Sequence, residues 1–304
     1  MATPLLGAHD SIYGHGVALG SVRVAGRDVV YAEWGDPDGV PVIAMHGTPG
    51  SRMGRWSDSA ALAATGVRQI GINRPGYGAS SRLEGRTVTA VVPDVLAVAD
   101  ALCVDRFTII GASGGGPHAL AVAALAPERV VRCRITSSLA PAAIPGFFDG
   151  MDPHNIEEWE LVLAGRGLPE VTRRAALMRS RVLTDPGSIF ADLALPASDQ
   201  AAMSERAAFA VRRESLLEAL TTPFGWYDDD VAFAQHWGFE LAQVCVPVEL
   251  RFGRHDVLVP PTHGDWLARA LPHAQVTCWE DQGHLGDGSV LDDLRALVTA
   301  SRQS

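Results

Sequence analysis

Ser113 stands in a segment whose residue types suit a nucleophile. It is the serine of a Gly-x-Ser-x-Gly motif at residues 111–115. An apolar, β-rich run precedes it (107–113), and a run of small residues typical of a helix follows it (117–126). A serine at such a tight turn projects its hydroxyl from the edge of the sheet, and small neighbours let strand and helix approach without a clash. The sequence therefore predicts that Ser113 is a nucleophile in covalent catalysis.

The same turn offers a place for developing negative charge. The backbone N–H of Gly114 would point toward an acyl oxygen, and the positive end of the next helix's dipole would lie beside it. The competing interpretation is a glycine-rich turn before a helix, such as a phosphate cradle. The chain contains no Gly-Lys-Ser/Thr sequence, so a nucleotide-binding P-loop is not supported.

The segments around this turn alternate between short strands and longer helices. That alternation is typical of a mostly parallel sheet covered by helices. Strands are expected at 22–33 (an antiparallel pair), 41–46, 67–73, 107–113, 130–138, 246–253 and 274–280. Helices are expected at 56–66, 88–102, 117–126, 262–270 and 288–301. The fold class predicted from this pattern is α/β.

Residues 139–240 interrupt the alternation. They contain several helical stretches and many large apolar side chains, but little strand pattern. We predict an α/β core formed by 1–138 and 241–304, and a helical cap formed by 139–240. The cap would lie over the carboxyl edge of the sheet, where ligands bind in open α/β structures.

Five segments resemble the α/β-hydrolase superfamily, and the resemblance spans nearly the whole chain. They are His46–Gly50, Asn73–Gly78, the turn at 111–115, Arg254–Asp256 and Gly283–His284. Within the superfamily the chain is most similar to small cap-bearing hydrolases of the esterase and proline-iminopeptidase type. Thr48 replaces the second glycine of their usual His-Gly-Gly-Pro-Gly motif. The resemblance implies a central sheet of about eight strands, flanking helices and an inserted helical cap.

The resemblance also implies a catalytic triad in the chain order serine, acid, histidine. A serine hydroxyl needs a base to take its proton and an acid to hold that base in one tautomer. His284 lies in a glycine-flanked loop after the last expected strand, and Asp256 follows the strand at 246–253. They are the expected base and acid. Asp281 and Asp149 remain alternatives for the acid.

The expected oxyanion hole combines the backbone N–H groups of Thr48 and Gly114. Arg74 is expected to stabilise the fold rather than to hold substrate. His46 would support the loop that carries Thr48, and His118 would pack inside or face the cap. The residues expected to line the substrate pocket are His46, His118, Phe147, Trp159 and Trp226.

These features predict a serine hydrolase that cleaves a carboxylic ester or lactone of a small, largely apolar substrate through an acyl-enzyme. The alternatives are a proline-iminopeptidase-like aminopeptidase, a carbon–carbon bond hydrolase and a catalytically silent small-molecule receptor on the same fold. A serine in the turn at 111–115 argues against dehalogenase or epoxide-hydrolase chemistry, for which the superfamily uses an aspartate at this position. Iminopeptidase relatives hold the substrate amine with cap carboxylates, and candidates here are Glu157, Glu158, Glu160, Glu205, Glu214 and Glu218.

The composition excludes several other classes. The 304 residues have a net charge of −10, and every basic residue other than histidine is arginine, which rules out lysine Schiff-base chemistry. An acidic chain without a basic run argues against a nucleic-acid partner. No stretch approaches the roughly 18 apolar residues of a membrane-spanning helix. The N-terminal residues lack the pattern of an export signal, so a cytoplasmic protein is expected, either monomeric or homodimeric.

The cysteines give no sign of a metal site or a redox pair. They lie far apart in apolar runs, and we expect buried, reduced thiols. No metal and no organic cofactor is expected, and the expected partner is a small-molecule substrate. The four are Cys103, Cys133, Cys245 and Cys278.

Overall fold

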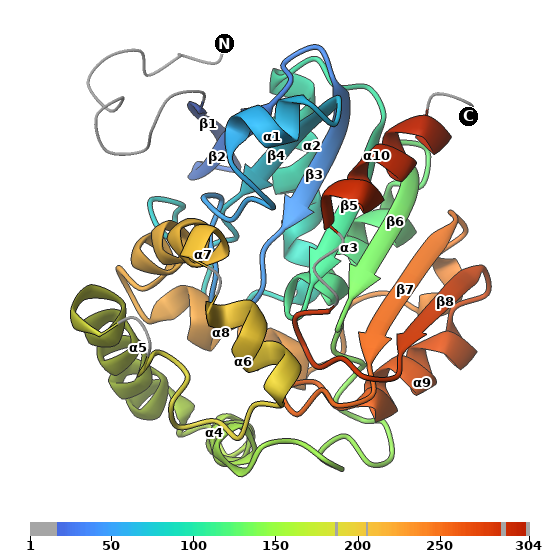
Figure 1. Cartoon of the computed structure of the whole chain (residues 1–304). Helices are drawn as coiled ribbons and strands as arrows, with labels where there is room; N and C mark the ends of the chain where they lie inside the picture. Colours follow the sequence, from blue (N-terminus) through green and yellow to red (C-terminus); the bar gives the residue numbers. More distant parts are fainter. Residues whose placement is uncertain (1–16, 186–187, 205, 287–289, 302–304) are drawn as a thin grey trace.

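One mixed sheet organises the chain (Figure 1). The computed structural model describes residues 17–185, 188–204, 206–286 and 290–301, in which eight strands follow the order β1-β2-β4-β3-β5-β6-β7-β8. Only β1–β2 and β2–β4 pair antiparallel; the others are parallel. The strands are β1 (Ala18–Val24), β2 (Arg27–Gly35), β3 (Val40–Met45), β4 (Val67–Ile72), β5 (Phe107–Ala112), β6 (Val130–Thr136), β7 (Val248–Gly253) and β8 (Ala274–Trp279). The predicted α/β class with a mostly parallel sheet is confirmed.

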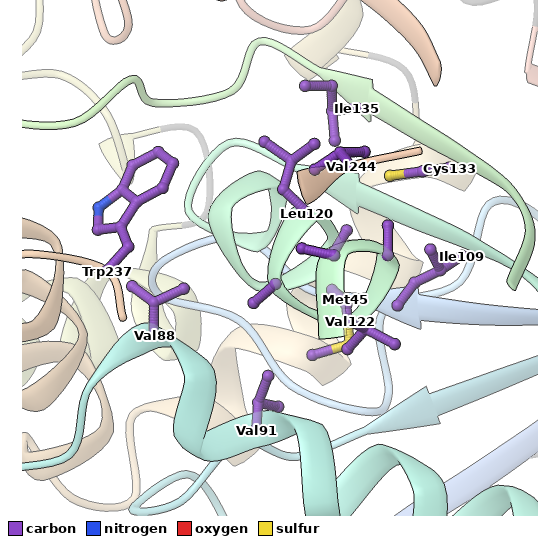
Figure 2. Packing of buried hydrophobic residues seen from close by; sticks show 14 of the residues in the cluster. Met45, Val88, Val91, Ile109, Leu120, Val122, Cys133, Ile135, Trp237 and Val244 are labelled. Atoms are coloured by element: carbon purple, nitrogen blue, oxygen red, sulfur yellow. The ribbon is translucent and has the colours of Figure 1, made fainter. Parts of the chain in front are cut away.

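The central strands are apolar on both faces because helices cover both sides. In β5, Ile109 belongs to the apolar cluster on one face and its neighbour Ile110 to the cluster on the other. The larger cluster packs beneath α2 (Val92–Ala101), α3 (Gly115–Leu125) and α9 (Pro261–Ala270). The smaller one packs beneath α1 (Ser59–Ala63) and α10 (Val290–Ser301). Figure 2 shows the α3 side chains Leu120 and Val122 packed among strand residues.

Within the described residues, five α-helices lie between β6 and β7 in the chain. Figure 1 shows them beyond the carboxyl ends of the parallel strands. Three of them, α5, α7 and α8, share an apolar cluster of their own that includes Val171, Leu216 and Trp226. The division into a core and a cap at residues 139 and 240 stays a prediction. The helices are α4 (Pro153–Leu163), α5 (Gly167–Thr184), α6 (Ala197–Ser204), α7 (Arg206–Ala219) and α8 (Phe224–Ala234).

Two helices differ from their predicted bounds. The helix expected over 56–66 is only α1, because the Asp58 carboxylate accepts the N–H of Ala61 at 2.8 Å and so caps its start. The helix expected over 88–102 divides into a short 3-10 turn, η1 (Val88–Val91), and α2. Pro93 stands in the first turn of α2, where its missing N–H needs no partner.

The prediction of four buried thiols is wrong. All four cysteines are free, but only Cys133 is buried. Cys103 lies in the turn after α2, Cys245 in the segment before β7 and Cys278 on the edge strand β8, so an apolar neighbourhood in the sequence did not mean burial.

Within the described ranges, each helix is too short or too polar to cross a bilayer. Histidine, cysteine and carboxylate side chains in the same ranges nowhere gather as a group of three able to hold a metal ion.

Candidate active site

Ser113 occupies the turn between β5 and α3 in a left-handed backbone conformation, with a φ of +53°. A non-glycine residue adopts this conformation only where its surroundings enforce it. The Ser113 N–H donates to the carbonyl of Thr136 on β6 at 2.9 Å. A Cβ atom on Gly111 would overlap the backbone of Gly115, and one on Gly115 would overlap the backbone of Met45. The glycines of the motif therefore permit the close approach of strand and helix that presents this serine.

His284 and Asp256 meet beside the same sheet edge. Asp256 Oδ2 lies 2.7 Å from His284 Nδ1, and its side chain is fully buried. The other oxygen, Oδ1, accepts the N–H groups of Leu258 at 2.8 Å and Val259 at 2.9 Å. A carboxylate fixed in this way accepts a hydrogen bond from the Nδ1–H of His284 and so leaves Nε2 with the lone pair that a base needs.

Two carboxylates raise the pKa of His284 above its ordinary value. Burial alone would lower the pKa, but the charge and hydrogen bond of Asp256, together with the charge of Asp199, outweigh burial. The exposed side chains of Asp281 and Asp149, the alternative acids, make no hydrogen bond to His284 in the described part of the chain. The geometry thus favours Asp256 as the partner of this histidine.

Ser113 and His284 line one cavity of about 1230 Å³. The structure gives them a common cavity rather than a direct contact, since the described residues show no hydrogen bond between Ser113 Oγ and the His284 ring. Catalytic hydrogen bonds in empty sites are often long and shorten when the substrate is bound.

Thr48 and Gly114 lie next to each other at this cavity. A Cβ atom on Gly114 would meet Thr48 Oγ1 and the ring of Phe233 on α8. The Thr48 hydroxyl donates to Asp229 at 2.7 Å and accepts from Arg74 at 3.0 Å. This hydroxyl is therefore already engaged by Asp229 and Arg74.

The side chain of Asp229, on α8, lies at the centre of a buried polar network that the sequence analysis missed. Five side chains contact its two oxygens: Arg74 Nη2 at 2.5 Å, Arg86 Nη2 at 2.6 Å, Thr48 Oγ1 at 2.7 Å, Tyr77 Oη at 2.8 Å and His118 Nε2 at 3.2 Å. Burial would raise the pKa of Asp229, but Arg74 and Arg86 hold it well below its usual range. The sequence feature that could have indicated this network is the run of three aspartates, 228–230, inside an otherwise apolar helix.

Three of the five expected pocket residues line the cavity: His46, Trp159 and Trp226. His118 and Phe147 do not, which corrects the prediction. His118 is enclosed between the Val88 carbonyl and Asp229, and burial lowers its pKa to about 4, so the ring is neutral near pH 7. The ring of Phe147 packs edge-on against Trp159 and His263, with centroids 4.9 and 4.6 Å apart, and so points into the packed interior.

His46 supports the loop that carries Thr48. Its Nδ1 lies 2.8 Å from the Gly47 carbonyl, and its ring packs edge-on against Tyr77. Burial, with the neighbouring positive charge of Arg74, lowers the pKa of His46 well below its ordinary value. A neutral ring with these contacts suits a structural role better than proton transfer.

Glu158 and Asp230 form a buried acid pair on the wall of the cavity. Glu158 accepts the indole N–H of Trp226 at 2.8 Å and lies 3.2 Å from Arg174. Burial, then the charge of Glu158, raises the pKa of Asp230 well above its usual range. Among the described residues, Asp230 Oδ2 is buried and has no hydrogen-bond partner.

The other cap carboxylates named from the sequence have different surroundings. Glu157 pairs with Arg174, Glu214 with Arg55 and Glu218 with Arg52. Glu160 is exposed, and Glu205 lies outside the described residues. Of this set, Glu158 lines the cavity.

Comparison with known proteins identifies the family. The chain belongs to the α/β-hydrolase fold family, whose model matches residues 40–286. It is 26% identical over 253 residues to a pimeloyl-[acyl-carrier protein] methyl ester esterase of Nitrosomonas europaea, covering 81% of this chain and 89% of that one. It is 30% identical over 151 residues to a non-heme chloroperoxidase of Streptomyces lividans, covering 48% of this chain and about half (55%) of that protein.

The solved structures agree on the fold. An enol-lactonase from Burkholderia xenovorans LB400 superimposes with a TM-score of 0.63 at 20% identity, covering 93% of this chain and 98% of that one. At this identity the likeness shows the fold alone. The relatives act on different bonds, so the family assignment establishes an α/β hydrolase without fixing its substrate.

We predict that Asp229→Ala destabilises the protein by about 3–5 kcal/mol, because it leaves Arg74 and Arg86 buried without their counter-charge. The free energy of unfolding from urea titration followed by circular dichroism measures this. Asp28→Ala is the control: it removes an exposed carboxylate 3.1 Å from Arg23 and should change the stability by less than about 1 kcal/mol. Equal, small effects of both substitutions would contradict the central place of Asp229.

Proposed function

We propose that the protein is a serine hydrolase that cleaves a carboxylic ester or lactone of a small, largely apolar substrate through an acyl-enzyme. The observation that carries this proposal is the 2.7 Å contact between Asp256 and His284 beside the cavity into which Ser113 is presented. Ser113, His284 and Asp256 would be nucleophile, base and acid. The family supports hydrolysis, and one of the chain's sequence relatives is an esterase.

The reaction would proceed in two halves. His284 Nε2 takes the proton of the Ser113 hydroxyl while Oγ attacks the substrate carbonyl carbon, and the N–H groups of Thr48 and Gly114 stabilise the oxyanion. The imidazolium, stabilised by Asp256, then gives its proton to the leaving alkoxide as the carbon–oxygen bond breaks. In the second half, His284 takes a proton from water, the hydroxide attacks the acyl-enzyme, and Ser113 recovers its proton as the acid leaves.

The cavity wall fits an apolar acyl or alcohol group. Apolar side chains from both the core and the inserted helices line it, including Ile110, Trp159, Trp226 and Phe233. Pockets of this kind gain affinity from apolar burial and orientation from a few polar groups.

The Glu158–Asp230 pair favours a second candidate, an aminopeptidase of the iminopeptidase type. An ammonium group placed between the two carboxyls would stabilise the ionised form of Asp230, whose Oδ2 otherwise lacks a partner. The same serine chemistry would then cleave an amide next to that ammonium.

We expect hydrolysis of p-nitrophenyl esters or lactones, and much slower release of arylamine from proline and other amino-acid arylamides. The reason is that burial and the charge of Glu158 raise the pKa of Asp230 and so disfavour the ionised form that would bind an ammonium group, while the cavity is lined mostly by apolar side chains. Initial rates on an ester chain-length series, on lactones and on arylamides measure this, with Ser113→Ala as the inactive control. Turnover of proline arylamide without ester turnover would favour the aminopeptidase. No labelling of the folded protein by a fluorophosphonate would favour a silent receptor.

We predict that Asp256→Asn lowers kcat by about 10⁴-fold in a folded protein, because the asparagine no longer holds the base in the correct tautomer. The rate should fall as the pH drops through the raised pKa of His284, since only the neutral ring accepts the serine proton. Losing the Asp256 charge lowers that pKa, so the acid limb of the kcat profile should move to lower pH.

The matching control for this substitution is Asp281→Asn, which changes an exposed carboxylate in the His284 loop and should leave the profile unchanged. Full activity of Asp256→Asn together with loss in Asp281→Asn would show that the acid is Asp281.

A further inference from the structure

A carboxylate from the inserted helices holds the loop that carries His284. Asp199 lies on α6 and is buried, with 1% of its surface exposed. Its Oδ2 accepts the backbone N–H of His284 and its Oδ1 that of Leu285, each at 2.9 Å. Both oxygens of one side chain thus bind two consecutive amides of the loop, and hydrogen bonds to a charged acceptor are stronger than neutral ones.

The loop sequence is matched to this contact. A Cβ atom on Gly283 would overlap Asp199 Oδ2 and the ring of Pro196, so glycine permits the close approach of α6. The core holds the same loop from its other side. Ser137 Oγ donates to the His284 carbonyl at 2.8 Å, and the His255 N–H donates to the Gln282 carbonyl at 2.9 Å.

We propose that Asp199 is a positioning residue for His284, through which the seating of the inserted helices on the core sets the place and the basicity of the catalytic base. This inference rests on the proposed function for the identity of the base. If α6 moves away from the core, the backbone N–H groups of His284 and Leu285 lose their acceptor. Of the two carboxylates near the His284 ring, Asp199 and Asp256, only Asp256 then remains in place. In this proposal the inserted helices both cover the cavity and help to position the catalytic base.

Electrostatics supports the same role. The charged groups that face the His284 ring are Asp256, from the loop after β7, and Asp199, from α6. Both negative charges stabilise the imidazolium that forms when Ser113 loses its proton. Removal of the Asp199 charge therefore lowers the pKa of His284 even where the loop keeps its conformation.

The test is Asp199→Asn, which keeps the shape of the side chain but offers one carbonyl oxygen to two N–H donors. We expect kcat for a p-nitrophenyl ester to fall about 10- to 100-fold, because small displacements of a catalytic group have effects of this size. KM should change less than about 2-fold, because the substrate contacts remain. The acid limb of the kcat profile should move to lower pH.

Asp152→Asn is the matched control. Asp152 is also buried, at the start of α4 in the same inserted segment, and its two oxygens accept the backbone N–H groups of His154 and Ala194, each at 2.9 Å. The substitution makes the same chemical change without touching the His284 loop, so kcat and the acid limb should stay at wild-type values. Equal losses in both variants would overturn the proposal, since they would show general damage to the inserted helices.

Two readouts do not depend on activity. Amide hydrogen exchange at His284 and Leu285 should accelerate in Asp199→Asn and stay unchanged in Asp152→Asn. The titration of the His284 ring followed by NMR should move to lower pH in the first variant alone. Wild-type rates of exchange and an unmoved titration in Asp199→Asn would overturn the proposal, whatever the substrate.

These readouts also separate the two proposals. Faster exchange and a shifted titration in a protein that cleaves no ester would support the role of Asp199 and refute the esterase. If Asp199→Asn fails to fold, Asp199→Ser serves in its place, since its hydroxyl can still accept one of the two N–H groups, and the same readouts apply.

Discussion

A single buried charge, the carboxylate of Asp229, constrains the candidate active site more than any other interaction in the described structure. A buried carboxylate is tolerated only where counter-charges and hydrogen bonds surround it. Here the partners come from the loop after β3 (Thr48), from the segment between β4 and η1 (Arg74, Tyr77 and Arg86) and from α3 (His118). One helix of the insertion is therefore tied to three separate segments of the core.

This network also determines how the oxyanion loop is oriented. Arg74 also donates to two backbone carbonyls, from Nη1 to that of His46 and from Nη2 to that of Gly47. The Gly47 carbonyl and the Thr48 N–H belong to one planar peptide unit and point in opposite directions. Since Arg74 holds that carbonyl, the Thr48 N–H points away from Arg74. The loop thus gains its orientation from side-chain contacts.

The inserted helices thus contact both halves of the proposed catalytic apparatus through carboxylates. Asp229 on α8 reaches the oxyanion side, and Asp199 on α6 reaches the base. The two carboxylates are stabilised differently. Asp229 is neutralised by arginines, whereas Asp199 binds backbone amides and keeps its charge close to His284.

Sequence reasoning reached the parts of the molecule that local rules determine. The alternation of strands and helices predicted the sheet, and the motif at Ser113 has a steric cause within a few residues. It did not reach Asp199, Asp229 or Asp230, because an acidic residue on an amphipathic helix has the same local pattern whether water or a buried arginine faces it. The pairing of Asp229 with Arg74 joins residues 155 positions apart, and no local spacing encodes it. His118 was misplaced for the same reason, since helical periodicity does not say which neighbour covers a face.

The Glu158–Asp230 pair in the cavity links the charge of the bound substrate to the ionisation of the protein. Asp230 stands three residues before Phe233 on α8. The two side chains therefore lie on the same face of the helix, separated by about 4.5 Å along its axis. The Phe233 ring lies against Gly114, and Glu158 and Asp230 line the same cavity as Ser113. A neutral ester would leave the raised pKa of Asp230 as it is. An ammonium group would favour the ionised form of Asp230, and close contact with both carboxyls would have to offset the cost of a buried charge. The Glu158–Asp230 pair therefore bears on which of the two proposed substrate classes the cavity binds.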